Sequence, residues 1–127
     1  MTVLVVDDHE PVLKMVKVLL EKNGHVALAA ASCDDALNLY AASSRPIDLV
    51  ILDLDMPGVN GFQTLSRLRQ IDEDVRAVLM SGGAVDPEEI TRSGFLGFLP
   101  KPFSISRLLA LTNAAGPTLS HRIKEPC

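Results

Sequence analysis

The sequence of 127 residues has no tryptophan, only 4% aromatic residues and only two cysteines. Two cysteines, Cys33 and Cys127, are too few for the disulfide framework of a small secreted domain, so we expect free thiols in a reducing compartment. Together with three scattered histidines, they also do not suggest a zinc site. No apolar run approaches the roughly 20 residues that a membrane span requires, and no leader-like segment opens the chain. These absences favour a soluble, cytoplasmic protein without a membrane segment.

An excess of basic residues is also missing. Twelve lysines and arginines face sixteen acidic residues, the formal net charge is −4, and the pI is near 5.2. The basic residues are scattered along the chain, which argues against nucleic-acid binding by this domain. A length of 127 residues with 47% hydrophobic composition fits one domain that can bury a core.

Short apolar runs alternate with segments of helical spacing five times along the chain. The apolar runs predict strands at residues 2–6, 26–30, 47–52, 75–80 and 95–99. The predicted helices have start signals, such as Ser32 as an N-cap and Asp86 followed by Pro87 before a short fourth helix. Asp48 is read as a solvated residue at the start of a strand. Because strand-to-strand crossovers are right-handed, this order predicts an α/β fold, a doubly wound parallel sheet with helices on both faces.

Polar side chains lie at the carboxyl ends of the predicted strands: Asp7 and Asp8, Asp53 and Asp55, Ser81, and Lys101. In sheets of this kind the ligand crevice lies outside the carboxyl ends of the strands. We therefore expect these side chains to meet in one crevice.

The expected crevice contains at least three carboxylates, which repel one another unless a cation lies between them. Oxygen ligands of this kind suit Mg²⁺. Lys101 and the Ser81 hydroxyl would neutralise the oxygens of a phosphoryl group in transfer. Asp53, which ends the most apolar strand, is the candidate nucleophile.

Four segments carry a resemblance to a known family: residues 3–8, 52–61, 80–82 and 99–103. In order and spacing they resemble the response-regulator receiver domains of two-component signalling, and the match runs from residue 2 to about residue 115. The resemblance implies a flavodoxin-like sheet with strand order 2-1-3-4-5. It also implies a receiver domain at residues 1–115, followed by a polar C-terminal tail or linker at residues 116–127.

The resemblance assigns Asp53 as the phosphoacceptor for a phosphoryl group from a histidine kinase or phosphotransfer protein. Asp8 would bind Mg²⁺ directly, Asp7 would hold a metal-bound water, and the main-chain carbonyl of Asp55 would complete the metal site. The side chain of Asp55 has no assigned role. A domain of this kind is not an enzyme in the usual sense, because it catalyses only its own phosphorylation and dephosphorylation.

The resemblance also implies a switch. Lys101 would contact the phosphoryl group, the Lys101–Pro102 bond would be cis, and Ser81 and Phe98 would move together on phosphorylation. The signal would pass to the face formed by the fourth helix, fifth strand and fifth helix, and so to an output partner that no motif identifies. The segment between Ser81 and Lys101 is about two residues shorter than is usual in the family. We expect few contacts over residues 82–94 and mobility there before phosphorylation.

Three other functions compete with this one. A haloacid-dehalogenase-like phosphatase would use Asp53-Leu54-Asp55 as its nucleophile motif, but that class usually begins with this motif and places its acid pair last. A pseudo-receiver that only binds partners would normally lack one of the key residues. A flavin-binding module would need a phosphate cradle where this chain has carboxylates.

Overall fold

Five parallel strands form the centre of the structure, a computed structural model that describes residues 1–115. The strands are β1 (Thr2–Val6), β2 (Val26–Ala30), β3 (Leu49–Asp53), β4 (Ala77–Ser81) and β5 (Gly97–Pro100). Their spatial order is β2-β1-β3-β4-β5, so the predicted topology is confirmed. The predicted tail at residues 116–127, with Cys127, lies outside the described residues.

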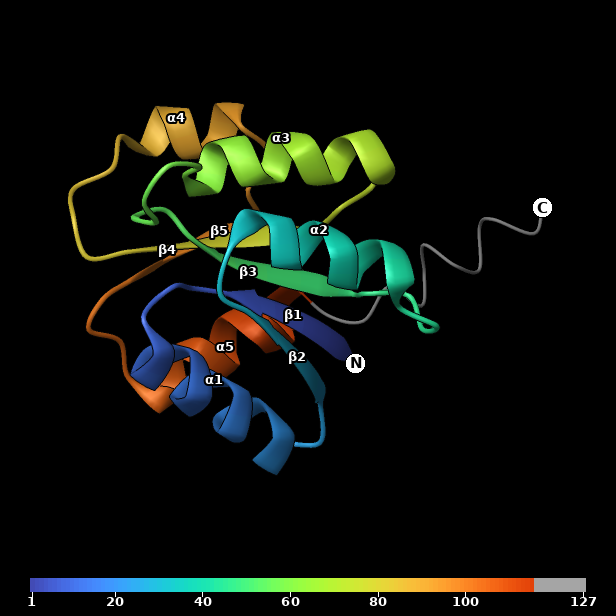
Figure 1. The fold of residues 1–127 in the computed structure, drawn as a ribbon. Helices are drawn as coiled ribbons and strands as arrows, with labels where there is room; N and C mark the ends of the chain where they lie inside the picture. The colour runs from blue at the N-terminus through green and yellow to red at the C-terminus, as the bar shows by residue number, and fades with distance from the viewer. Residues whose placement is uncertain (116–127) are drawn as a thin grey trace.

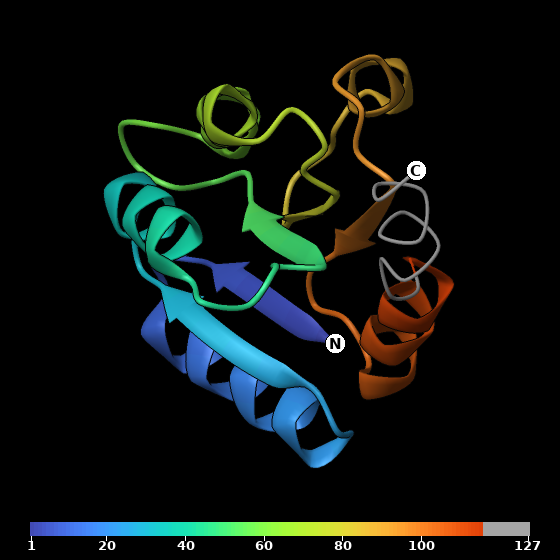
Figure 2. The same cartoon turned by 90° about the vertical axis from the view of Figure 1, so that its right-hand side faces the viewer.

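Helices cover both faces of this sheet (Figures 1 and 2). On one face lie α1 (Glu10–Lys22) and α5 (Ile105–Ala115). On the other lie α2 (Cys33–Ala42), α3 (Gly61–Ile71) and α4 (Pro87–Arg92). Within residues 1–115 no helix is both long and apolar enough to cross a membrane.

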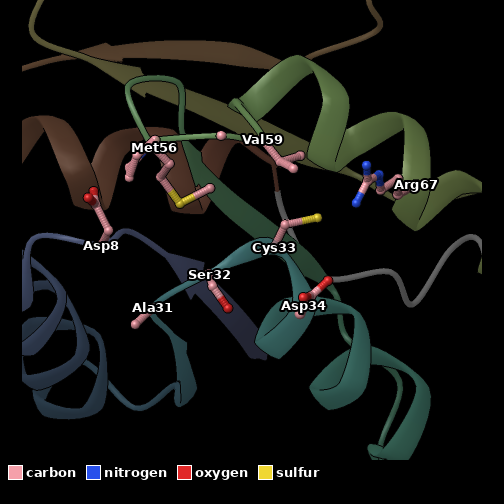
Figure 3. A pocket seen from close by; sticks show the side chains of 10 residues that line it. Asp8, Ala31, Ser32, Cys33, Asp34, Met56, Val59 and Arg67 are labelled. Atoms are coloured by element: carbon pink, nitrogen blue, oxygen red, sulfur yellow. The ribbon is translucent and has the colours of Figure 1, made fainter.

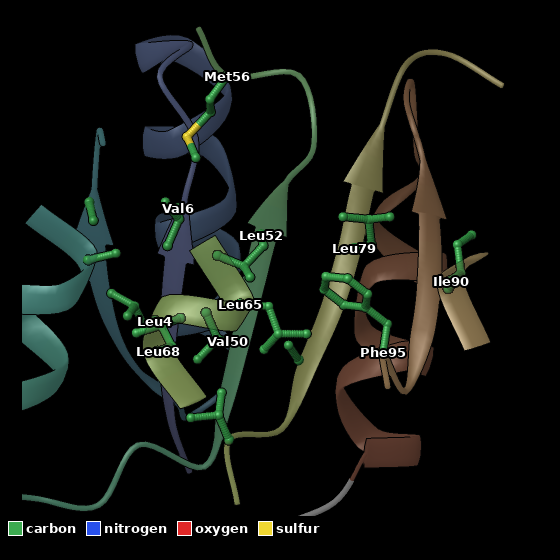
Figure 4. Close-up of a cluster of buried hydrophobic side chains, with 14 residues drawn as sticks. Leu4, Val6, Val50, Leu52, Met56, Leu65, Leu68, Leu79, Ile90 and Phe95 are labelled. Carbon is green, nitrogen blue, oxygen red and sulfur yellow. The ribbon is translucent and has the colours of Figure 1, made fainter. Parts of the chain in front are cut away.

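Two hydrophobic clusters join the helices to the sheet. Alternate residues of a strand point to opposite faces, so Val3 and Val5 pack toward α1 and α5, whereas Leu4 and Leu52 pack toward α2, α3 and α4 (Figure 4). Each fully buried leucine contributes roughly 2 kcal/mol to stability. Because β1 and β3 are buried along their whole length, the polar residues that follow them are held by a rigid base.

Side-chain caps set the helix starts. Ser32 accepts the amide of Asp35 and Asp86 accepts the amide of Glu88, so both predicted N-caps are confirmed. Asn60 and Gln63 form a reciprocal capping box at α3 that the sequence analysis did not predict.

Three strands begin two residues later than predicted, and the residues before them are buried for other reasons. Val75 and Phe95 are buried in the core without belonging to a strand. The prediction that Asp48 is solvated is wrong, because the residue is only 4% exposed and its Oδ2 accepts a hydrogen bond from the Thr2 amide at 2.7 Å. A charged side chain next to an apolar run predicts exposure to water, but this one accepts a hydrogen bond from a buried backbone amide.

The short helix α4 is confirmed, but the expectation that few contacts hold the segment is wrong at its C-terminal end. The guanidinium of Arg69, from α3, donates to the carbonyls of Ser93 at 2.6 Å and Gly94 at 3.2 Å. The ring of Phe95 packs edge-to-face on Phe62, with centroids 5.7 Å apart. Two interactions therefore attach the end of α4 to α3. The Arg69 cation lies at the C-terminus of α4, the negative end of the helix dipole, and Phe62 packs on Phe95.

Candidate functional site

The carboxyl ends of the strands bring the predicted site residues together. Asp7 and Asp8 directly follow β1, Asp53 ends β3, Ser81 ends β4, and Lys101 directly follows β5. Parallel pairing aligns these ends, since Asp53 pairs with Met80 and Ser81 with Pro100. The crevice predicted from sequence therefore exists as a set of adjacent side chains.

Three carboxylates form an acidic cluster. One oxygen from each of Asp7, Asp8 and Asp53 lies within 4.8 Å of the other two. Asp7 and Asp53 are 0% and 2% exposed, whereas Asp8 faces solvent. A buried pair of carboxylates beside an accessible one suits a hard cation that keeps some of its waters. The donor set therefore fits Mg²⁺.

Lys101 is the positive charge beside this cluster. Its ammonium donates to Asp7 Oδ2 at 2.8 Å and to Asp53 Oδ1 at 3.2 Å. Its main-chain amide donates to the Ser81 carbonyl, and the Lys101–Pro102 bond is cis, as predicted. Lys101 therefore compensates the two buried carboxylates directly.

Charge and burial shift the pKa values of both partners. Burial raises the pKa of Asp53, the nearby Asp7 carboxylate raises it further, and Lys101 only partly opposes them. Burial by itself lowers the pKa of Lys101, but hydrogen bonds and charge from Asp7 and Asp53 outweigh it, so the pKa lies above its usual value. Lys101 is therefore charged at neutral pH. Because burial and Asp7 disfavour the ionised form of Asp53, a cation bound nearby would stabilise that carboxylate.

Asp7 has a structural role as well. Its Oδ1 accepts the amide of His9 at 2.8 Å, at the turn into α1, while its Oδ2 accepts from Lys101. Both oxygens of Asp7 therefore have protein donors, which leaves Asp8 as the accessible member of the acid pair.

Gly61, the first residue of α3, lies too close to the end of β3 to carry a side chain. A Cβ atom at this position would lie 3.0 Å from the Asp53 carbonyl and 3.1 Å from Leu54 Cα. Glycine thus allows α3 to approach the end of β3 closely, and a side chain here would displace the backbone that carries Asp53.

The side chain of Asp55 makes contacts that the sequence analysis missed. Its Oδ2 accepts the Ser81 hydroxyl at 2.9 Å and the Gly82 amide at 3.2 Å. The Ser81 oxygen in turn accepts the Gly83 amide at 3.0 Å. The sequence does contain a signal for the contact between Asp55 and Ser81: a carboxylate just beyond β3 and a hydroxyl at the end of the adjacent strand.

Phe98 lies in β5, half-buried, and packs against the cluster under α2, α3 and α4. The structure thus places it one strand beyond Ser81, paired with Leu79. Its rotation on phosphorylation stays a prediction.

A cavity of about 280 Å³ opens beside the acidic cluster, between the start of α2 and the loop after β3 (Figure 3). Asp8 lies at one side of it and Arg67 of α3 at the other, with Cys33 between them. Only one of the three clustered carboxylates lines this cavity, so the cluster itself, and not the cavity, is the candidate site.

Comparison with known proteins agrees with this geometry. Residues 3–113 match the family model of the response regulator receiver domain. The chain belongs to this family. The strand order and the acidic cluster at the strand ends agree with the expectations from the resemblance. Because the family model covers nearly the whole chain, we set aside the haloacid-dehalogenase-like phosphatase alternative.

The relatives of this receiver domain include short and long proteins. It is 33% identical over 108 residues to sporulation initiation phosphotransferase F of Bacillus subtilis (strain 168), covering 84% of this chain and 86% of that protein. It is 35% identical over 81 residues to the Fimbriae Z protein of Escherichia coli (strain K12), covering 63% of this chain but only 38% of that protein. The chain therefore corresponds to part of the longer relative.

Solved structures show the same fold. Chemotaxis protein CheY4 of Vibrio cholerae superposes with a TM-score of 0.82 at 26% identity, covering 90% of this chain and 97% of that one. The Borrelia burgdorferi CheY chain, solved in a complex with CheX, BeF₃ and Mg²⁺, superposes with a TM-score of 0.82 at 25% identity, covering 90% and 87%.

Proposed function

We propose that Asp53 of this receiver domain accepts a phosphoryl group from a phosphohistidine on a histidine kinase or phosphotransfer protein. The observation that carries this proposal is the convergence of three carboxylates with Lys101 at the ends of β1, β3 and β5. The Borrelia burgdorferi relative, which was solved with Mg²⁺ and a phosphoryl mimic, supports it.

Asp7, Asp8, Asp53 and the main-chain carbonyl of Asp55 would hold Mg²⁺. The ion would supply positive charge that offsets the repulsion between the carboxylates and the incoming phosphoryl oxygens. Asp8 is the accessible ligand, and Asp7 is oriented by the His9 amide and by Lys101.

In the transfer step an oxygen of Asp53 forms a bond to phosphorus while the bond between phosphorus and the donor's imidazole nitrogen breaks. The imidazole keeps the electron pair and takes up a proton. Lys101, already 3.2 Å from Asp53, remains beside the new phosphoryl oxygens and compensates their charge. Because β3 is buried along its length, Asp53 needs little reorganisation to react.

The proposed output is a change at Ser81 and Phe98 that alters the face formed by α4, β5 and α5. Ser81 ends the strand adjacent to β3, so its hydroxyl can turn toward a phosphoryl group on Asp53. An unidentified protein would bind that face. Since phosphohistidine donors are made from ATP inside the cell, the proposal also places the domain in the cytoplasm.

The test is phosphorylation by acetyl phosphate or phosphoramidate with Mg²⁺, followed by intact-mass measurement. Wild type should gain one phosphoryl group, and Asp53→Asn should gain none because an amide is not a nucleophile. Asp34→Asn, which changes an exposed acid in α2, is the matched control and should be labelled like wild type. Equal labelling of the Asp53→Asn variant would contradict the assignment.

A further inference from the structure

Asp55 connects the loop after β3 to the end of β4. The hydrogen bonds that it accepts come from Ser81 and Gly82, which are 26 and 27 residues away in sequence. A local Asp turn would bond to backbone within two or three residues, so these contacts are tertiary and not part of a turn. The amide of Asp55 itself donates weakly to Asp53 Oδ1 at 3.4 Å. One residue thus lies between the proposed phosphoacceptor and the switch serine.

The Ser81 hydroxyl has a single proton, which it can donate to one acceptor at a time. In this structure the acceptor is the Asp55 carboxylate. The oxygen of Ser81 also accepts the Gly83 amide, which orients the hydroxyl so that its proton points to Asp55. A phosphoryl group on Asp53 could accept a hydrogen bond from the Ser81 hydroxyl only if the hydrogen bond from Ser81 to Asp55 were broken first.

The Gly82 amide also donates to Asp55, so a phosphoryl oxygen would compete with Asp55 for this amide as well. Ser81 and Gly82 together present one O–H and one N–H donor to a single carboxylate oxygen, which makes a small anion-binding site already filled by a side chain. A phosphoryl oxygen would seek the same kind of donors. The Asp55 carboxylate would also repel a phosphoryl group two residues away.

We infer that the Asp55 carboxylate is a built-in competitor of the phosphoryl group for the Ser81 hydroxyl and the Gly82 amide. In the unphosphorylated domain it holds both donors, and it must release them before Ser81 can bind a phosphoryl oxygen. Asp55 is thus a positioning residue that weakens phosphoryl binding and keeps the switch serine in its resting position. This inference rests on the proposed role of Asp53.

The test measures binding of beryllofluoride with Mg²⁺, a stable mimic of the phosphoryl group, by NMR of the backbone amides. Asp55→Ala removes the competitor and should raise the affinity about tenfold, the size expected for a hydrogen bond to a charged group. Asp55→Asn keeps an acceptor oxygen without the charge and should give a smaller gain. The free Asp55→Ala protein should already show shifted Gly82 and Gly83 amide signals.

Two controls separate competition from a general effect of charge. Titration with Mg²⁺ alone should show no tighter binding in Asp55→Ala, because removing a negative charge near the acidic cluster cannot attract the cation more strongly. In a Ser81→Ala background, Asp55→Ala should give a clearly smaller gain, since the contested hydroxyl is already gone.

The outcomes distinguish this inference from the proposed function. Beryllofluoride that bound wild type and Asp53→Asn alike would refute the assignment of Asp53. If wild type binds beryllofluoride at Asp53 but Asp55→Ala binds it no more tightly, the competitor role is wrong while the phosphoacceptor stands. A gain of the same size with and without the Ser81 hydroxyl would also overturn the role, because charge repulsion alone would then explain it.

Discussion

Buried strands hold the ends of β1 and β3 at the crevice, whereas the loop that follows the equally buried β4 depends on a few side-chain hydrogen bonds. Every residue of β1 and β3 is buried, and these strands hold Asp7, which follows β1, and Asp53, which ends β3. Beyond Ser81, in contrast, residues 82–84 are exposed and connect to the crevice through Asp55. The proposed chemistry therefore lies on the rigid side, and the proposed switch lies on the side that can change at low cost.

The segment after Ser81 is itself divided. Its beginning is exposed, but its end is bonded to α3 through Arg69 and the Phe62–Phe95 pair. A conformational change that starts at Ser81 should therefore not extend past Gly94, which Arg69 holds in place. We accordingly narrow the expected mobility from residues 82–94 to residues 82–86, and hydrogen exchange with and without beryllofluoride measures it. Protection that changed equally throughout residues 82–94 would contradict this division.

The largest expected effect is loss of Mg²⁺ binding in Asp8→Ala. Removing the accessible ligand leaves too few oxygens for a small hard ion, and Asp7 is already committed to the His9 amide and Lys101. Because Asp8 is exposed and its charge repels Asp7 and Asp53, the variant should be at least as stable as wild type without metal. Metal titration by NMR decides the first point and calorimetry the second. Unchanged Mg²⁺ affinity would remove Asp8 from the site.

Lys101→Met should produce the next largest effect, on stability. It leaves two buried carboxylates without their cation, and we expect a loss of about 3 kcal/mol, the low end for a broken buried ion pair, because the Lys101 side chain is 21% exposed. Mg²⁺ should recover part of this loss by replacing the charge. Urea unfolding with and without Mg²⁺ measures both.

Lys14→Met is the control for that experiment. Lys14 pairs with Glu10 on the surface of α1, and its loss should cost no more than about 0.5 kcal/mol with or without Mg²⁺. If Lys101→Met were equally mild, the acidic side of the crevice would not depend on the lysine for its stability.

Arg69→Ala should loosen the fixed end of α4. Losing two hydrogen bonds to the helix C-terminus should cost about 1–2 kcal/mol and should increase amide exchange across residues 87–94. Arg67→Ala, on the same helix, is the control, because Arg67 lines the cavity beside the start of α2 and not the end of α4. Similar exchange in both variants would show that the Phe62–Phe95 pair holds α4 without the arginine.

Tyr40→Phe should have the smallest effect and one that depends on pH. The Tyr40 hydroxyl donates to Asp72 at 2.7 Å, so its loss should cost about 1 kcal/mol at neutral pH. Burial raises the pKa of Tyr40 above its usual value of 10.0, and the hydrogen bond to Asp72 and nearby acidic charges raise it further. The contribution of Tyr40 to stability is therefore complete below pH 10 and is lost as pH rises above it.

Absorbance of tyrosinate tests the pKa of Tyr40 directly, because the chain has one tyrosine and no tryptophan. The folded protein should ionise at higher pH than the urea-unfolded protein. The difference in stability between wild type and Tyr40→Phe should shrink above pH 10. Ionisation of the folded protein near pH 10 would mean that the hydroxyl is not held by Asp72.

Local pattern was enough to predict the order of strands and helices, but not where three of the strands begin. Their apolar character predicts that Val75 and Phe95 lie in strands, yet both are buried in the core outside any strand, Phe95 against the ring of Phe62. Asp48 was read as solvated because it is charged, yet it is buried against the Thr2 amide. Hydrophobicity indicates burial, but it does not indicate which partner does the burying.

The sequence by itself determined the architecture and the members of the candidate site. Alternating strands and helices imply a parallel sheet, and parallel strands bring residues such as Asp53 and Lys101 to one edge. Only the tertiary structure decided that Asp55 bonds to Ser81 and that Arg69 bonds to Ser93. These contacts join residues that are 24 or more positions apart, and they depend on the direction of each side chain after packing, which no periodicity in the sequence records.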